Sequence, residues 1–153
     1  MTFGNELAGV KQSLRDRPGY LLRRCLQETS RNFETACEDV GITERQYDYL
    51  FVLDQVDMMT QGDLSKVLDV DRSTNTLVIR ILEKKGLVER WNHPADSRKK
   101  CLRLSNEGKA VLGITRPRAE QSAEKLLASL SILDASRLMT MLNTILDKSV
   151  EAD

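Results

Sequence analysis

The strongest constraint on the fold lies between residues 60 and 104, where two short helices and a hairpin follow one another. Thr60-Gln61-Gly62-Asp63 has the composition of a helix start, and Leu64, Val67 and Leu68 then predict a short helix with an apolar side. Asp71 can cap a second helix, which Gly86 ends. Two helices joined by so tight a turn indicate helix-turn-helix geometry.

The second of these helices is predicted to carry polar side chains on its outer face. At about 100° per residue, its inward side holds Leu77, Val78, Ile81, Leu82 and Lys85. Ile79 flanks the outer side, and Asn75 stands at its edge. Arginine can grip guanine, asparagine can grip adenine, and serine or threonine can bond a base or a phosphate. The candidate DNA-reading residues are therefore Arg72, Ser73, Asn75, Thr76 and Arg80.

A basic hairpin follows the second helix. Residues 87–91 alternate like a strand, residues 92–97 have turn chemistry, and residues 100–104 read as the returning strand. Such a two-stranded ribbon would place Arg98 or Lys99 at a neighbouring minor groove or sugar-phosphate backbone. The plainer interpretation is an ordinary surface helix followed by a solvated hairpin.

The distribution of charge favours a polyanionic partner. The whole chain has 23 Lys and Arg against 23 Asp and Glu, so composition alone does not indicate a nucleic-acid binder. Residues 71–103, however, carry nine basic and four acidic side chains, which leaves the rest of the chain acidic. A basic segment within an acidic protein is an electrostatic footprint for a polyanion, and the alternative is a solvated charged surface.

Apolar-striped helices surround this unit. The sequence predicts helices over residues 5–14, 18–40, 43–57, 105–130 and 134–146. Thr43 and Gln46 are spaced as a capping box, Ser105 can cap the fourth helix, and Pro117 is expected to bend or stall it. The terminal helices have no obvious partner in so small a lobe, and unpaired apolar stripes call for a second copy of the chain.

These features resemble the winged helix-turn-helix of the MarR family of bacterial transcriptional regulators. The family's DxR wing is matched by Asp96 and Arg98, its exit from the recognition helix by residues 82–90, and its LxxEG motif by residues 104–108. The resemblance covers nearly the whole chain. His93 departs from it by standing where aspartate is common, and Ser97 by falling within the usual run of wing arginines.

The resemblance implies a mainly α fold with a two-stranded β-wing, which Asp96 stabilises, and long N- and C-terminal dimerisation helices. Residues 1–42 and 109–153 would dimerise, and residues 43–108 would bind DNA, all within one integrated domain. The expected function is that of a homodimeric repressor on a near-palindromic operator.

The resemblance also implies release from DNA by a small aromatic or phenolic acid. An arginine beside aromatic side chains can hold a carboxylate in a mostly apolar cleft. The candidates for such a site are Tyr20, Arg23, Arg24, Tyr47 and Phe51. Alternatively, the two arginines pair with acids of the partner subunit and the aromatic residues belong to the core.

A second candidate signal is oxidation of Cys25, whose neighbouring arginines could lower the thiol pKa. Cys101 is expected to be a small strand filler. The three cysteines fit free thiols in a reducing cytoplasm, and a single histidine without a CxxC motif predicts no metal site and no cofactor.

Two other functions compete with DNA binding. A winged helix can also be a protein-interaction module, but protein interfaces usually deplete lysine and favour aromatic residues. An enzyme is disfavoured because the sequence holds no paired carboxylates and no Gly-rich phosphate loop. No apolar run approaches the ~20 residues that a membrane span requires.

Overall fold

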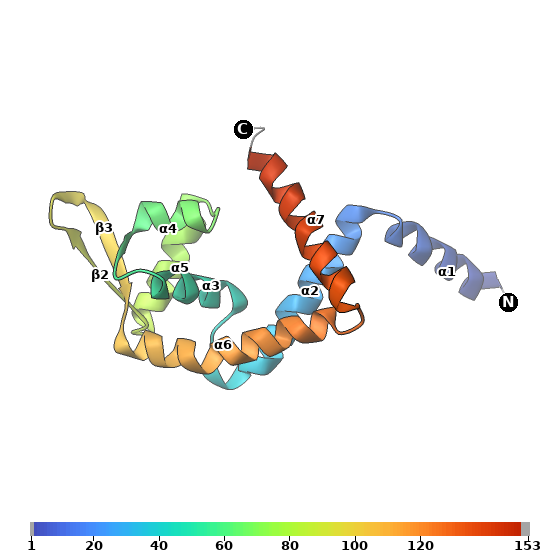
Figure 1. Ribbon diagram of the computed structural model, residues 1–153, viewed down its shortest axis with the longest axis horizontal. Coiled ribbons are helices and arrows are strands. Elements are labelled where there is room, and N and C mark those ends of the chain that lie inside the picture. Colours follow the sequence, from blue (N-terminus) through green and yellow to red (C-terminus); the bar gives the residue numbers. More distant parts are fainter. Residues whose placement is uncertain (1, 151–153) are drawn as a thin grey trace. The chain divides into compact units, whose positions relative to one another are not determined.

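The computed structural model describes residues 2–150, and the chain forms two compact units. One unit comprises residues 1–32 and 121–153, and the other comprises residues 33–120. No helix within residues 2–150 combines the length and apolarity needed to cross a bilayer. The helices and strands are α1 (Thr2–Arg15), α2 (Pro18–Cys37), η1 (Glu38–Val40), α3 (Glu44–Asp54), β1 (Met59–Thr60), α4 (Gln61–Val67), α5 (Arg72–Lys84), β2 (Val88–His93), β3 (Asp96–Leu104), α6 (Asn106–Leu127) and α7 (Ile132–Val150) (Figure 1).

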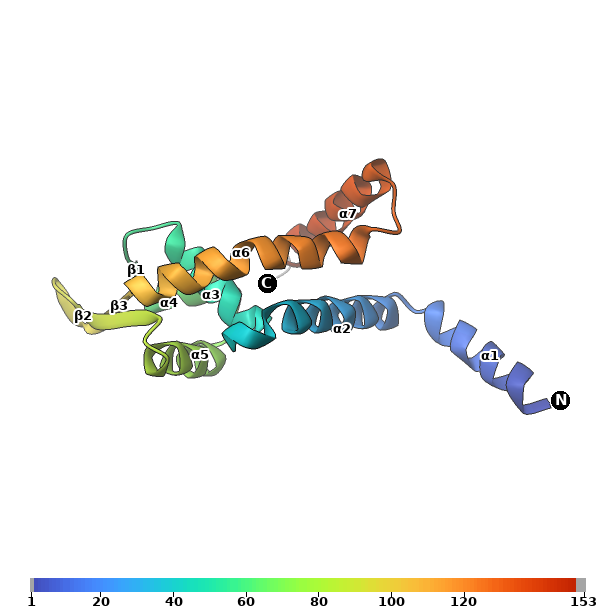
Figure 2. The ribbon, with the colours of Figure 1, turned by 90° about the horizontal axis from the view of Figure 1, so that it is seen from below.

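The unit of residues 33–120 is built around a small antiparallel sheet in the order β1-β3-β2. β3 pairs with β2 over most of its length, from Val88 opposite Leu104 to His93 opposite Asp96. It also pairs with the two-residue strand β1, which the sequence did not predict. Helices α3, α4 and α5 pack against this sheet. In both views the loop between β2 and β3 projects beyond these three helices (Figures 1 and 2).

The core of this unit joins all of its elements. Tyr49, Leu50 and Leu53 of α3 and Leu64 of α4 are at most 1% exposed. They form one cluster with Ile79 and Leu82 of α5 and Leu102 of β3, all of them at most 1% exposed. Burying an aliphatic side chain of this size contributes roughly 1.5–3 kcal/mol relative to leaving it in water. This shared core therefore fixes α5 against the sheet.

Most of the predicted helix boundaries are confirmed. Thr43 Oγ1 accepts from Gln46 N at 3.3 Å, and Thr60 Oγ1 accepts from Asp63 N at 3.2 Å. Gly41 and Gly86 adopt the left-handed conformation, with φ of 68° and 71°, that ends a helix or turn. The other half of the capping box differs from the prediction. The Gln46 side-chain oxygen accepts from Lys85 Nζ at 2.8 Å, and the same amine donates to the Gly41 carbonyl.

The long helix predicted across Pro117 is confirmed, since α6 runs through this proline to Leu127. One local prediction is corrected. Val67 does not face inward, because 59% of it is exposed at the end of α4.

The close packing around Gly108 explains why the LxxEG motif has a glycine at this position. A Cβ at this position would lie 2.1 Å from the Leu87 carbonyl oxygen and 3.2 Å from Leu104 Cδ2. The Leu87 carbonyl also accepts from Ser105 N at 3.1 Å. Ser105 Oγ in turn accepts from Gly108 N at 2.9 Å, as expected for a helix cap. The first turn of α6 is thus seated on the start of β2, where only glycine fits.

In the other unit the large apolar side chains remain uncovered. Among its described residues no aliphatic or aromatic side chain is buried within the chain. The exposed large apolar residues of this unit are Leu7, Val10, Leu21, Leu22, Leu26, Leu130, Ile132, Leu133, Leu138, Met139, Met141, Ile145 and Leu146. An apolar surface of this kind normally marks an interaction site.

A glycine pair in α6 tests the close approach at Gly108. Gly108→Ala is expected to destabilise the protein by about 1–3 kcal/mol, because a backbone carbonyl would have to move. Gly113→Ala is the matched control, since no atom lies within 4 Å of its added Cβ. It should stabilise by roughly 0.5–1 kcal/mol through helix propensity. Urea unfolding of both variants measures this, and equal effects would contradict the assignment.

Candidate nucleic-acid interface

The start of α5 is fixed by the Asp71 carboxylate. Its Oδ1 accepts from the backbone N–H groups of Ser73 and Thr74 at 2.8 and 2.9 Å, and its Oδ2 accepts from Thr74 Oγ1 at 2.6 Å. These hydrogen bonds, that of the Thr74 hydroxyl foremost, hold the pKa of Asp71 below its usual value. In the turn before it, Asp69 has a φ of 47° and Val70 N donates to Ser65 O at 3.0 Å. The turn and cap together set where the helix begins.

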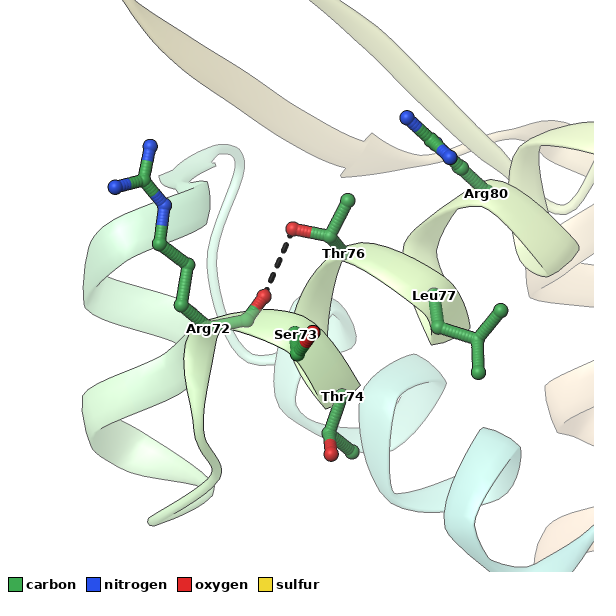
Figure 3. A pocket seen from close by; sticks show the side chains of 6 residues that line it. All are labelled: Arg72, Ser73, Thr74, Thr76, Leu77 and Arg80. Atoms are coloured by element: carbon green, nitrogen blue, oxygen red, sulfur yellow. Dashed lines mark hydrogen bonds between the residues drawn. The ribbon is translucent and has the colours of Figure 1, made fainter.

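The outward side of α5 forms what we call the reading face, which consists of Arg72, Ser73, Thr76, Leu77 and Arg80. With Thr74 these residues line one shallow hollow (Figure 3). Arg72, Ser73, Leu77 and Arg80 are exposed and Thr76 is half-buried. Four of the five DNA-reading residues predicted from the sequence therefore lie together on one surface.

Asn75, the fifth predicted residue, is not on that surface. It is 2% exposed, and its Nδ2 donates to the Gln61 carbonyl at 2.8 Å. The predicted phase of the helix was wrong as well, because Ile79 is 1% exposed and Leu77 is 60% exposed. The buried residues are Asn75, Val78, Ile79 and Leu82. They follow the i, i+3, i+4, i+7 spacing of a helix core stripe, which was missed because its first member is polar.

The Asn75 contact belongs to a small network between α4 and α5. Gln61 Nε2 donates to Thr76 Oγ1 at 3.2 Å, and Thr76 Oγ1 donates to the Arg72 carbonyl at 2.8 Å (Figure 3). Gln61 therefore contacts α5 through both its backbone carbonyl and its side chain. This network fixes the position of the Thr76 side chain.

The wing is the hairpin of β2, β3 and the turn between them. At its tip His93 Nδ1 accepts from Ala95 N at 3.1 Å, so the imidazole closes the turn at the position where the family pattern has aspartate. Asp96 Oδ1 accepts from Arg98 N at 3.1 Å and from Arg98 Nε at 3.3 Å. These bonds suit the predicted role of Asp96 in stabilising the wing. The Arg98 side chain is nevertheless 91% exposed.

The positive charge of this region is only partly available. Arg103 pairs with Glu89 at 2.7 Å and lies over the Trp91 ring at 5.3 Å. Arg90 pairs with Glu83 at 3.4 Å. Within the described residues, by contrast, no ion pair is found for five exposed basic side chains of this segment: Arg72, Arg80, Lys84, Lys85 and Lys99. Of these, the Lys85 amine is engaged by the Gly41 carbonyl and the Gln46 side chain. Helix and wing cations thus remain free to meet an anionic partner.

A concave surface joins the helices to the wing. α4 contributes Gln61 and Lys66 to it, and α5 contributes Arg72 and Thr76. The wing contributes Arg90, Arg98, Lys99 and Lys100. The structure therefore brings Arg72 and Thr76 together with Arg98 and Lys99 on one surface. An arginine- and lysine-rich groove beside an exposed helix face can bind phosphates and base edges at once.

The predicted effector residues fall into two groups, one in each unit. In the first unit, Tyr20 and Arg23 line a hollow at the α1–α2 turn. Arg24 is engaged within α2, with Gln27 at 2.6 Å and Glu28 at 3.4 Å.

In the second unit, Tyr47 lies 5.5 Å from Phe33 and 6.0 Å from Phe51 between ring centroids. Arg116 lies over the Phe51 ring at 5.6 Å and pairs with Asp54 at 2.7 Å. Burial raises the pKa of the Tyr47 hydroxyl. Arg116 was not predicted as a site residue, because in the sequence it is only a basic residue within a predicted helix.

The cysteines differ in exposure. All three are free thiols, Cys25 being exposed and Cys37 and Cys101 buried. Cys101 is 0% exposed in β3, which confirms it as a strand filler. Burial raises the pKa of the Cys37 thiol, which makes it a poor nucleophile. Cys25 is therefore the thiol that an oxidant could reach.

Comparison with known proteins gives a consistent result. The model of the MarR family matches residues 42–100. A proposed transcriptional regulatory protein for the hcr operon of Thauera aromatica is 30% identical over 134 residues, which span 87% of this chain and 81% of that protein. The transcriptional repressor NicR of Pseudomonas putida is 27% identical over 137 residues, which span 90% of this chain and 87% of NicR.

Solved structures agree in fold. A mutant of Escherichia coli MarR in complex with operator DNA has a TM-score of 0.79 and 26% identity, covering 84% of this chain and 92% of that chain. Bordetella bronchiseptica BpsR, whose DNA binding is regulated by 6-hydroxynicotinic acid, has a TM-score of 0.81 and 27% identity, covering 86% and 94%. The predicted winged-helix fold is confirmed by these similarities.

A stability measurement separates the buried asparagine from the exposed residues beside it. Asn75→Ala should destabilise the protein by about 1–3 kcal/mol, because the Gln61 carbonyl loses its donor in a partly buried place. Ser73→Ala, on the exposed face of the same helix, should change stability by less than about 0.5 kcal/mol. Thermal unfolding of the two variants checks this. An Asn75→Ala variant as stable as the parent would mean that Asn75 does not fix α5.

Proposed function

The chain belongs to the MarR family of DNA-binding transcriptional regulators, and on that basis we propose that it is a homodimeric repressor of a near-palindromic operator, released by a small aromatic or phenolic acid. The observation that carries the DNA-binding part is the groove shared by α5 and the wing. In this proposal Arg72, Ser73, Thr76 and Arg80 meet base edges in the major groove. Arg98 and Lys99 contact the adjacent minor groove or the phosphates.

The homodimer is supported by the uncovered apolar side chains of α1, α2 and α7. Leaving Leu22, Leu26, Met141, Ile145 and Leu146 in water is unfavourable, and a second copy of the same helices would cover them symmetrically. A two-fold dimer would present two copies of α5 to one side of the duplex, about one helical turn or ~34 Å apart. An operator with two related half-sites follows from this geometry. Residues 1–42 and 109–153 are the segments to which we assign dimerisation.

Effector control is supported by the relatives and by the chemistry of the candidate residues. The DNA binding of BpsR is regulated by 6-hydroxynicotinic acid, an aromatic carboxylic acid. Here Tyr47 and Phe51 offer aromatic surface, and Arg23 offers an exposed guanidinium. Tyr20 and Arg24 complete the candidate set. Binding would favour a dimer whose two recognition helices are wrongly spaced for DNA, so the operator is released by a shift of population.

Oxidation is a second candidate signal because the Cys25 thiol is exposed. Its modification within α2 would alter a segment that we assign to dimerisation. DNA binding of the parent and of Cys25→Ser is measured with and without peroxide. If peroxide abolishes the DNA binding of both proteins, Cys25 is not the oxidised residue that controls it.

Paired substitutions test the DNA-binding surface. Arg98→Ala should weaken binding to all duplexes alike and reduce the salt slope by about one, because it removes a phosphate-type contact. Arg80→Ala should cost roughly 1–3 kcal/mol on the preferred sequence and blunt sequence preference. Salt-dependent titrations of duplexes selected from a random pool provide both readouts. If a protein with both substitutions still distinguished the selected duplexes from random duplexes as well as the parent does, the assignment of this surface to DNA binding would be contradicted.

An effector panel tests release. Benzoic, hydroxybenzoic and hydroxynicotinic acids, added to the complex with the selected duplex, should include at least one acid that dissociates it. Arg23→Ala or Tyr47→Phe should raise the concentration required at least several-fold while leaving DNA affinity unchanged. Release by no member of the panel, or identical release from both variants, would refute the assigned effector class or residues.

A further inference from the structure

Leu77 is an apolar side chain in the middle of a charged surface. It is 60% exposed, although the neighbouring Val78 and Ile79 are buried. It lines the same hollow as Arg72, Ser73, Thr76 and Arg80 (Figure 3). Leu77 therefore adds nothing to the core and meets whatever binds the reading face. Its chemistry allows only an apolar contact there.

Thr76, beside Leu77, also presents an apolar group. Its hydroxyl donates to the Arg72 carbonyl at 2.8 Å and accepts from Gln61 Nε2 at 3.2 Å. Both interactions are internal, so the proton of this hydroxyl is not available to a base. In Figure 3 the methyl group points away from the helix while the oxygen turns back toward Arg72. The expectation that Thr76 reads a base through its hydroxyl is replaced by a methyl contact.

Leu77 and the Thr76 methyl form an apolar strip on α5. In the sequence Arg72 precedes this strip and Arg80 follows it. Arg72 and Arg80 are eight residues apart, which corresponds to about 12 Å along the helix axis. That length equals three to four base pairs at about 3.4 Å each. No acid pairs with either arginine within the described chain. This charge pattern complements a duplex and not an apolar protein surface.

One apolar group fits this position in a duplex. Of the base edges in the major groove, thymine alone carries a methyl group, at C5, and the other groups are hydrogen-bond donors and acceptors. We propose that Leu77 is a specificity-determining residue that contacts the 5-methyl group of a thymine in each operator half-site, with the Thr76 methyl beside it. This inference rests on the proposed DNA-reading role of α5 and adds a base identity to it.

Replacing thymine by deoxyuridine removes only that methyl group and leaves the pairing unchanged. On the selected duplex, deoxyuridine at one thymine of each half-site should weaken binding by the parent protein about fourfold per half-site. This is the change in affinity expected for the loss of one buried methyl group. The contribution should come from thymines within the span that the two arginines cover. Binding of the unmodified duplex is measured first, so failure of the proposed function is seen separately.

Three variants assign the contact. Leu77→Ala should bind thymine and deoxyuridine duplexes equally at the sensitive position. Val67→Ala is the matched control, since Val67 is an aliphatic residue of the same unit with 59% exposure that lies off the reading face. It should keep the fourfold difference. Thr76→Ser retains the hydroxyl and removes only the side-chain methyl group. A loss of preference for thymine in this variant therefore measures the contribution of the Thr76 methyl.

Either of two results would overturn the proposal. The first is a parent protein that binds all deoxyuridine-substituted duplexes as tightly as the thymine duplex. The second is a Leu77→Ala variant that keeps the same preference for thymine as Val67→Ala.

Discussion

Burial of one stripe of α5 is the interaction on which the rest of the molecule's proposed activity depends. Val78, Ile79 and Leu82 pack into the core of the 33–120 unit, and Asn75 extends the stripe by bonding to the Gln61 carbonyl. Because a helix is rigid, fixing this side also fixes the opposite one. Arg72, Leu77 and Arg80 are therefore held outward, and the hydrogen bond from Gln61 holds the Thr76 side chain beside them. The orientation of the reading face is a consequence of packing behind it.

The wing is attached to this frame at its base and is open at its tip. Near the base, Ser105 Oγ donates to the Gly86 carbonyl at 2.6 Å, and Gly108 allows α6 to touch the Leu87 backbone. Farther out, Glu89 and Glu83 neutralise Arg103 and Arg90, so these two arginines brace the hairpin. Arg98 and Lys99 remain exposed at the end. Net charge over a segment therefore overstates what a nucleic acid would meet.

Local chemistry made much of this fold predictable. Asp71, Thr60 and Ser105 each bond to the backbone that the sequence assigned to them, and Gly86 ends α5 where expected. The features that the sequence did not predict depend on tertiary packing. Asn75 looks like a surface residue until its partner, the carbonyl of Gln61, is known. β1 is only two residues long, and its identity as a strand comes from pairing with Leu102 and Cys101.

The effector residues show the same limit more strongly. Aromatic and arginine side chains mark a candidate set, but periodicity does not say which helices meet. The structure adds Arg116 beside Phe51, a contact between α3 and α6 that no local pattern encodes. The reading face, by contrast, belongs to one helix, so its exposed members could be found once the buried stripe was phased correctly.

Dimethyl sulphate footprinting of the selected operator would show whether α5 lies in the major groove, because the reagent methylates guanine N7 there. We expect two protected clusters of guanines about one helical turn apart. Arg72→Ala and Arg80→Ala should each restore reactivity at particular guanines, whereas Val67→Ala should restore none. A single cluster, or protection that both arginine variants leave unchanged, would contradict the claim that two copies of α5 face the duplex.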